Sequence, residues 1–176
     1  GGTWRDNNYP GLCCDVPSHL YSYSFAPNPD WSRRFAPGAE IQAYFQSVAR
    51  RFHLDGAIRT HAEVTRCEYR DGRWHLTLAD GAIDVADFVI CATGVLVQPQ
   101  YPDIPGLETF SGPCFHSARW DHGVGLAEQR IGVVGTGSTA VQIVSALVKE
   151  VAHLSLFQRT AQWIFPQPNP AYRDDE

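Results

Sequence analysis

The stretch from Ile131 to Ala140 constrains the fold more than any other part of the 176-residue chain, because it reads Ile-Gly-Val-Val-Gly-Thr-Gly-Ser-Thr-Ala. A short apolar strand leads into a Gly-x-Gly-x-x-Ala turn, and a helical pattern follows it. Such glycines permit a tight turn and let the backbone approach a pyrophosphate, and the alanine keeps the helix close to the strand. We predict one β–α–β unit, with strands at 130–134 and 154–158 and a helix at 138–150. The residues expected to touch a dinucleotide here are Gly135, Thr136, Gly137, Ser138, Thr139 and Ala140.

The end of the second predicted strand indicates which dinucleotide is bound. A site for NAD usually carries an acid about 20 residues beyond the glycine turn, whereas a site for NADP favours an arginine for the 2′-phosphate. The chain has Gln158-Arg159-Thr160 at this place and no acid. We therefore expect Arg159 and Thr160 to select NADP(H); the competing interpretation is an arginine that lies on the surface by chance.

Apolar spacing and turn residues predict the other elements. Apolar residues recur at helical intervals from Ile41 to Phe52, after Pro37-Gly38. Asp-Gly pairs at 71–72 and 80–81 are typical hairpin turns, and the run 88–92 is continuously apolar, as in a buried parallel strand. Residues 1–37 have no periodicity and read as a loop, and a loop of this length in a compact protein is usually either functional or misassigned. The predicted strands are 57–60, 64–69, 74–78, 83–85 and 88–92.

Composition and charge exclude several classes of function. The net charge of −5 argues against nucleic-acid and anionic-membrane partners. No apolar run approaches the roughly 20 residues that span a bilayer. The five cysteines match no zinc spacing, so we expect reduced thiols in a cytoplasmic protein, and no metal site.

Two further stretches resemble a known family. Residues 110–120 read Phe-Ser-Gly-Pro-Cys-Phe-His-Ser-Ala-Arg-Trp, which is similar to the Phe-x-Gly-x-x-x-His-x-x-x-Trp fingerprint of type I Baeyer–Villiger monooxygenases. The opening, Gly2-Thr3-Trp4 through Tyr9-Pro10-Gly11 to Asp15, resembles the second signature of that family, and Ala92-Thr93-Gly94 resembles its link between nucleotide domains. The fingerprint residues are Phe110, Gly112, His116 and Trp120.

The resemblance implies an α/β fold: part of a Rossmann-like flavoprotein with two dinucleotide-binding domains and a small β-rich region in the FAD domain. Residues 1–97 would belong to the FAD domain, 98–128 to a connector that carries the fingerprint, and 129–176 to the start of the NADPH domain. The chain would be an internal piece of the enzyme, and these 176 residues alone are expected to be inactive. The residues that the resemblance assigns to FAD or to its surroundings are Gly2, Thr3, Trp4, Asp15, Tyr21, Val64, Thr93 and Gly94.

The resemblance also implies a reaction. FAD, NADPH and O2 would together insert oxygen next to the carbonyl of a small-molecule ketone and give an ester or a lactone. Asp15 is the expected catalytic residue of this chain, near the reactive edge of the flavin, where it would hold an arginine that lies outside the chain. Cys13 stands where the family commonly has an arginine, so one contact to the nicotinamide cofactor is in doubt. His116 is expected to couple domain movement to cofactor handling.

Two alternatives remain open. The first is an N- or S-oxygenating flavin monooxygenase of the same superfamily, although Trp120 and Asp15 favour the Baeyer–Villiger type. The second is a chain that binds nucleotide without turnover. The sequence does not indicate which ketone is the substrate, nor the oligomeric state.

Overall fold

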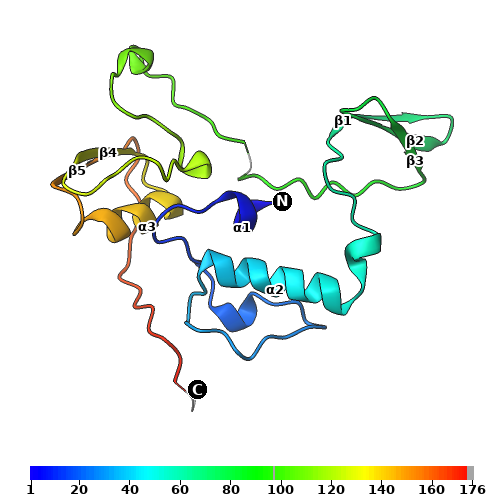
Figure 1. Cartoon of the computed structure of the whole chain (residues 1–176), viewed down its shortest axis with the longest axis horizontal. Coiled ribbons are helices and arrows are strands. Elements are labelled where there is room, and N and C mark those ends of the chain that lie inside the picture. Colours follow the sequence, from blue (N-terminus) through cyan, green and yellow to red (C-terminus); the bar gives the residue numbers. More distant parts are fainter. Residues whose placement is uncertain (97, 174–176) are drawn as a thin grey trace. The chain divides into compact units, whose positions relative to one another are not determined.

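The glycine turn lies where the sequence places it, between a strand and a helix, in the computed structural model, which describes residues 1–96 and 98–173. Strand β4 (Arg130–Val134) pairs in parallel with β5 (His153–Phe157), in a register that sets Ile131 opposite Leu154. Helix α3 (Ser138–Leu147) makes the crossover between these strands and lies alongside them in Figure 1. The predicted β–α–β unit is confirmed, with a helix that ends three residues early.

Residues far apart in the sequence form the core on α3. Tyr9, Ile143 and Leu147 are buried together, and half-buried apolar side chains from the N-terminal loop, the connector and both strands surround them. Ala140 of the glycine turn is also buried, as its expected packing against the strand requires. The surrounding apolar residues are Leu12, Trp120, Leu126, Val133, Val151 and Leu154.

The chain divides into two compact units, one formed by Gly1–Phe45 with Gly94–Glu176 and the other by Gln46–Thr93. The border falls within helix α2 (Gly38–Arg51), which confirms the predicted helix. In the first unit, Ile41 and Tyr44 of α2 are buried. The ring of Tyr44 packs 5.3 Å from that of Trp31 and 6.2 Å from that of Tyr23, between ring centroids.

The second unit contains an antiparallel sheet of strands β1 (Val64–Arg70), β2 (Arg73–Leu78) and β3 (Ile83–Ala86), in that order. Asp71 and Gly72 both have positive φ angles, of 51° and 77°, which is the backbone of a two-residue hairpin turn whose twist matches the strands. The second Asp-Gly pair also forms a turn, in which the Asp80 carboxylate accepts a hydrogen bond from Ala82 N–H. These three predicted strands are confirmed.

The other two predicted strands, 57–60 and 88–92, are wrong in this structure. Residue Ala57 closes a 3₁₀ turn (Leu54–Gly56), whose hydrogen bonds extend to Ile58 and use the backbone groups that a strand would need. Within the described residues no strand pairs with 88–92, and the side chains of Phe88 and Ile90 are 88% and 90% exposed. A parallel strand depends on neighbours for its backbone hydrogen bonds, and periodicity within the strand cannot show whether they are there.

The segment of residues 1–37 is ordered by helix α1 (Thr3–Asp6), by a 3₁₀ turn (Ser18–Leu20) and by hydrogen bonds. Ser18 is fully buried, and its hydroxyl lies 2.7 Å from the carbonyl oxygen of Arg33 and 2.9 Å from that of Arg34. From the far end of the chain, the Asn169 side chain donates to the carbonyl of Phe35 and accepts from its N–H, both at 2.9 Å. The predicted loop is therefore held by specific polar contacts. The two remaining short 3₁₀ turns are Leu107–Thr109 and Ser117–Arg119.

Within residues 1–96 and 98–173, no helix combines the length and the apolar character that crossing a lipid bilayer demands. The same residues hold no cluster of three or more His, Cys, Asp or Glu side chains arranged to bind a metal ion.

We expect Ser18→Ala to lower the stability of the full-length protein. The substitution removes a buried hydroxyl that bridges two backbone carbonyls, at a cost of about 1–3 kcal/mol, and the urea midpoint should fall. Ser24→Ala, at an exposed serine of the same segment, is the matched control. Equal midpoints for the two variants would contradict the structural role of Ser18.

Candidate functional site

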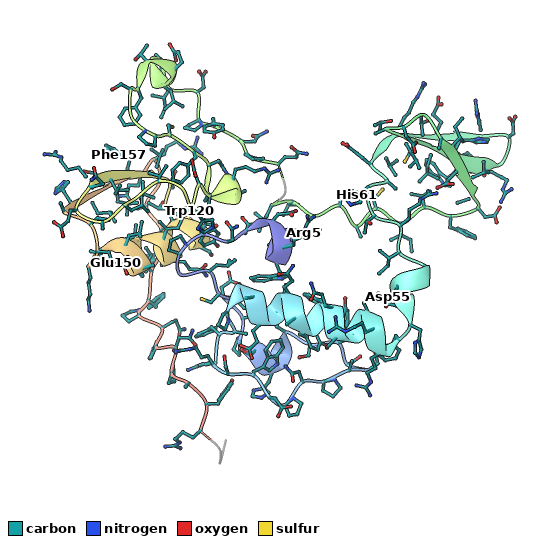
Figure 2. All side chains as sticks on the ribbon, viewed as in Figure 1. Arg5, Asp55, His61, Trp120, Glu150 and Phe157 are labelled. Atoms are coloured by element: carbon teal, nitrogen blue, oxygen red, sulfur yellow. The ribbon has the colours of Figure 1, made fainter. Side chains whose placement is uncertain are left out.

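The glycine turn leaves open space in front of helix α3. Gly135 has a φ of +116°, which side chains disfavour, and its N–H donates to the carbonyl oxygen of Phe157 at 2.9 Å. A Cβ atom added at Gly135 or Gly137 would meet no atom within 4 Å. The turn is thus held against the end of β5, near Phe157 (Figure 2), while the volume before the helix stays free for a ligand.

The N-terminus of α3 suits an anion. The first backbone hydrogen bond of the helix runs from Val141 N–H to Gly137 O. Within the described residues, no acceptor is found for the N–H groups of Ser138, Thr139 and Ala140. Unpaired N–H groups and the positive end of the helix dipole together favour a phosphate. The residues of this turn therefore fit a pyrophosphate.

Arg159 follows β5, close to the glycine turn in the fold. Thr136 Oγ1 donates to the carbonyl of Thr160 at 3.3 Å, which ties the turn to the segment that carries Arg159. The Arg159 side chain is exposed, and no carboxylate of the described residues forms an ion pair with it. As far as the described residues go, its guanidinium can meet a phosphate group.

The N-terminal signature contacts the same helix. The hydroxyl of Ser138 donates to the Asp15 carboxylate at 3.3 Å. One helical turn further on, the side chain of Gln142 bonds to both backbone groups of Cys13 and to the phenol of Tyr9. The structure therefore brings the predicted catalytic residue Asp15 to the start of the predicted nucleotide-binding helix.

Burial changes the pKa values of three side chains where the N-terminal segment meets α3. It raises the pKa of the Cys13 and Cys14 thiols and that of the Tyr9 phenol, although a hydrogen bond with Thr139 acts in the opposite direction on Tyr9. All three groups therefore stay protonated and neutral near neutral pH. The Cys13 side chain supplies no positive charge at the place where the resembling family has an arginine.

Trp4, predicted to lie along a flavin, contacts Tyr21, predicted to line the FAD site. Trp4 Nε1 donates to Tyr21 Oη at 3.1 Å, and the two rings meet edge to face with centroids 5.8 Å apart. Gly2, with a φ of +90°, and Thr3 open the same short helix α1. The indole ring is thus held in a fixed orientation.

An open pocket of about 560 Å³ lies beside α1. Trp4 lines it, together with Tyr9, Cys13 and Arg33, but the glycine turn does not. The pocket is a separate hollow, and its polar lining includes Asn7, Asn8, Gln42 and Asn169.

Of the four fingerprint residues, His116 and Trp120 contact other parts of the connector or α3, whereas Phe110 and Gly112 contact each other. His116 Nδ1 accepts from Ala118 N–H at 3.1 Å, and His116 N–H donates to Tyr101 Oη at 3.1 Å. Trp120 lies beside α3, as Figure 2 shows, and packs on the core there, with its ring centroid 5.2 Å from that of Phe115. Phe110 is 63% exposed, and its ring covers Gly112 so closely that a Cβ would lie 2.8 Å from it. His116 and Trp120 thus fix the connector locally.

Val64 and Thr93 belong to the second unit, so the structure does not relate them to the residues above. Val64 begins β1, and Thr93 and Gly94 lie exposed outside helices and strands. The roles of these residues, as of the other predicted site residues, stay predictions. Sequence reasoning missed Gln142; the signal in the sequence is a polar residue on the largely apolar helix α3, four positions after Ser138.

Comparisons with known proteins agree on one family. The model of the flavin-binding monooxygenase-like family matches residues 5–170. The chain is 54% identical over 172 residues to an uncharacterised monooxygenase of Mycobacterium tuberculosis, covering 98% of this chain and 35% of that protein. It is 51% identical over 173 residues to a Baeyer–Villiger monooxygenase of Streptomyces coelicolor, covering 97% and 33%. The chain therefore spans about a third of the length of these relatives.

Solved structures resemble the chain over nearly all its length. Cyclohexanone monooxygenase from Rhodococcus, bound to NADP+, matches 99% of this chain and 34% of its own, with a TM-score of 0.87 and 39% identity. The protein OTEMO, in complex with FAD and NADP, matches 99% and 35%, with a TM-score of 0.91 and 34% identity. These likenesses confirm the predicted fold class, part of a two-dinucleotide-binding-domain α/β flavoprotein.

We expect Gly11→Ala to detach the N-terminal segment from α3. A Cβ at Gly11, where φ is +82°, would lie 2.6 Å from the Gln142 carbonyl oxygen. The backbone alone costs about 1–2 kcal/mol, and the clash adds to it. Gly106→Ala is the control, because its φ is +85° and the nearest atom lies at 3.6 Å. Urea unfolding should show a larger loss for Gly11→Ala, and equal losses would contradict the close contact.

Proposed function

Because this chain belongs to the flavin-binding monooxygenase-like family, we propose that it is part of a flavoprotein monooxygenase of the Baeyer–Villiger type. The complete protein would use FAD, NADPH and O2 to insert oxygen next to a ketone carbonyl and give an ester or a lactone. The observation that carries this proposal is the contact between Asp15, of the flavin-related signature, and Ser138, of the glycine turn. That contact joins the two cofactor signatures at one place.

NADPH would bind at the glycine turn and beyond β5. Its pyrophosphate would accept hydrogen bonds from the N–H groups of residues 138–140, which have no acceptor among the described residues. Arg159, exposed and without an ion pair in the described chain, would bind the 2′-phosphate beside Thr160. The open space at Gly135 and Gly137 supports this placement.

FAD would lie along the residues of α1. The hydrogen bond to Tyr21 would hold the Trp4 indole in place as a flat contact surface for the flavin, beside Gly2 and Thr3, while Tyr21 lines the site. Val64 would touch the adenine end, and Thr93-Gly94 would form the link between nucleotide domains. When bound, FAD and NADPH would supply the electrons and the oxygen activation.

Asp15 would serve the reaction by orienting a cationic partner. Its carboxylate is exposed and, among residues 1–96 and 98–173, accepts one side-chain hydrogen bond, from Ser138, so its remaining acceptor sites are available to an arginine. We propose the domain limits 1–97 for the FAD domain, 98–128 for the connector and 129–176 for the NADPH domain, in a cytoplasmic enzyme. His116 and Trp120 would link the connector to nucleotide binding, since Trp120 packs on α3.

The reaction type is tested with the full-length protein. We expect NADPH oxidation that depends on a cyclic ketone, with a lactone as the product in chromatography and mass spectrometry. Amines and sulfides, offered in parallel, should support little turnover. N-oxide or sulfoxide as the main product would instead favour the alternative oxygenation, and flavin-free protein without turnover would contradict both.

Cofactor choice is tested by Arg159→Ala. Losing hydrogen bonds to a charged phosphate costs about 1.5–3 kcal/mol, so the KM for NADPH should rise about 10- to 150-fold and that for NADH should change little. Arg130→Ala, at an exposed arginine where β4 begins and thus away from the turn, is the control. Steady-state kinetics with both nucleotides measures the effect, and equal changes for NADPH and NADH would refute the assignment.

A further inference from the structure

We propose that Gln142 is a positioning residue, a clamp that fixes the segment of residues 9–15 on α3 and thereby sets where the Asp15 carboxylate lies. The inference rests on the proposed function, because it explains how this chain holds Asp15 for the reaction. Gln142 itself is not expected to touch substrate or cofactor.

Both the nitrogen and the oxygen of the Gln142 carboxamide form hydrogen bonds. Its Nε2 donates to the Cys13 carbonyl at 2.9 Å, and its Oε1 accepts from Cys13 N–H at 3.4 Å and from Tyr9 Oη at 3.1 Å. The side chain thus pairs with both backbone groups of one residue, as a neighbouring strand would. Because these atoms are partly buried, water competes poorly for the same bonds.

Packing leaves the segment little freedom to shift. Gly11 lies so close to the backbone of α3 that a Cβ would come within 2.6 Å of the Gln142 carbonyl oxygen. Tyr9, which bonds to the Gln142 side chain, is 7% exposed and packs with Ile143 and Leu147. Lifting the segment off the helix would therefore break hydrogen bonds and open a core.

The spacing of residues within the two segments places Asp15 at the start of α3. Ser138 and Gln142 are four residues apart on one face of α3, a rise of about 6 Å. Cys13 and Asp15 are two residues apart, and two residues of chain span at most about 7 Å. With Cys13 held by Gln142, Asp15 reaches Ser138, to which it bonds at 3.3 Å.

The two attachments differ in strength. The bond between Ser138 and Asp15 is long and exposed to water, whereas Gln142 makes three bonds at a partly buried place. Ser138 also opens the helix whose N–H groups suit a pyrophosphate, so its hydroxyl is the part that a nucleotide would most readily displace. The position of Asp15 then depends on Gln142, and the carboxylate moves together with α3.

The first test measures the clamp without any turnover. Cys14 is 2% exposed, and burial raises its pKa, so its thiol should react slowly with iodoacetamide. In full-length Gln142→Met, alkylation of Cys14, followed by peptide mass spectrometry, should accelerate about tenfold or more as the segment opens locally. Gln129→Met, at an exposed glutamine of the same unit, should match the wild type. The exposed Cys67 should be alkylated at the same rate in every variant, which shows that the reagent concentration is equal. Unchanged Cys14 reactivity in Gln142→Met would overturn the clamp.

The second test asks whether Gln142 acts through Asp15. We expect Gln142→Met to lower kcat about tenfold while the KM for NADPH stays within about twofold, because the glycine turn is intact. The double variant with Asp15→Asn should be no slower than Asp15→Asn alone. Losses that multiply would show that Gln142 only supports the fold. A wild-type protein without ketone-dependent turnover would contradict the proposed function instead, and the alkylation rates would still decide the clamp.

Discussion

The contact between the backbone of Gly11 and helix α3 is the constraint on which the candidate site depends. No residue with a side chain fits there, since a Cβ would lie 2.6 Å from a carbonyl oxygen. The close approach lets a helix side chain, Gln142, reach the backbone of Cys13 and lets Tyr9 enter the core. A segment without repeating secondary structure is thereby fixed in position by hydrogen bonds and packing, as a strand in a sheet would be.

Helix α3 has two roles that use different parts of it. Its N-terminus, with N–H groups that find no acceptor in the described chain, faces open space at the glycine turn. Its side holds Tyr9 and Trp120 against Ile143 and Leu147. The same short helix thus offers an anion-binding N-terminus and packs against segments of the N-terminal loop and the connector. A shift of α3 when an anion binds can therefore be transmitted to both segments.

Local chemistry explains which elements could be predicted from the sequence. The glycine turn, the Asp-Gly hairpins and the apolar stripe of α2 are determined by residues close in the chain, and all were found. The apolar run at 88–92 carries a strand pattern, but pairing depends on distant partners that the pattern does not contain. Gln142 was missed for a related reason, because a glutamine on a helix looks like a surface residue until the segment 9–15 is placed beside it.

The pairing of Asn169 with Phe35 links residues 134 positions apart, and the bond between Tyr9 and Gln142 spans 133. On a ribosome that adds about 5–20 residues per second, Phe35 would wait roughly 7 to 27 seconds for the side chain that satisfies its backbone. Throughout that interval the Phe35 backbone lacks the Asn169 side chain, and until α3 is made Tyr9 lacks its core partners Ile143 and Leu147. During synthesis this segment must therefore stay soluble without its final contacts, either by itself or bound to a chaperone.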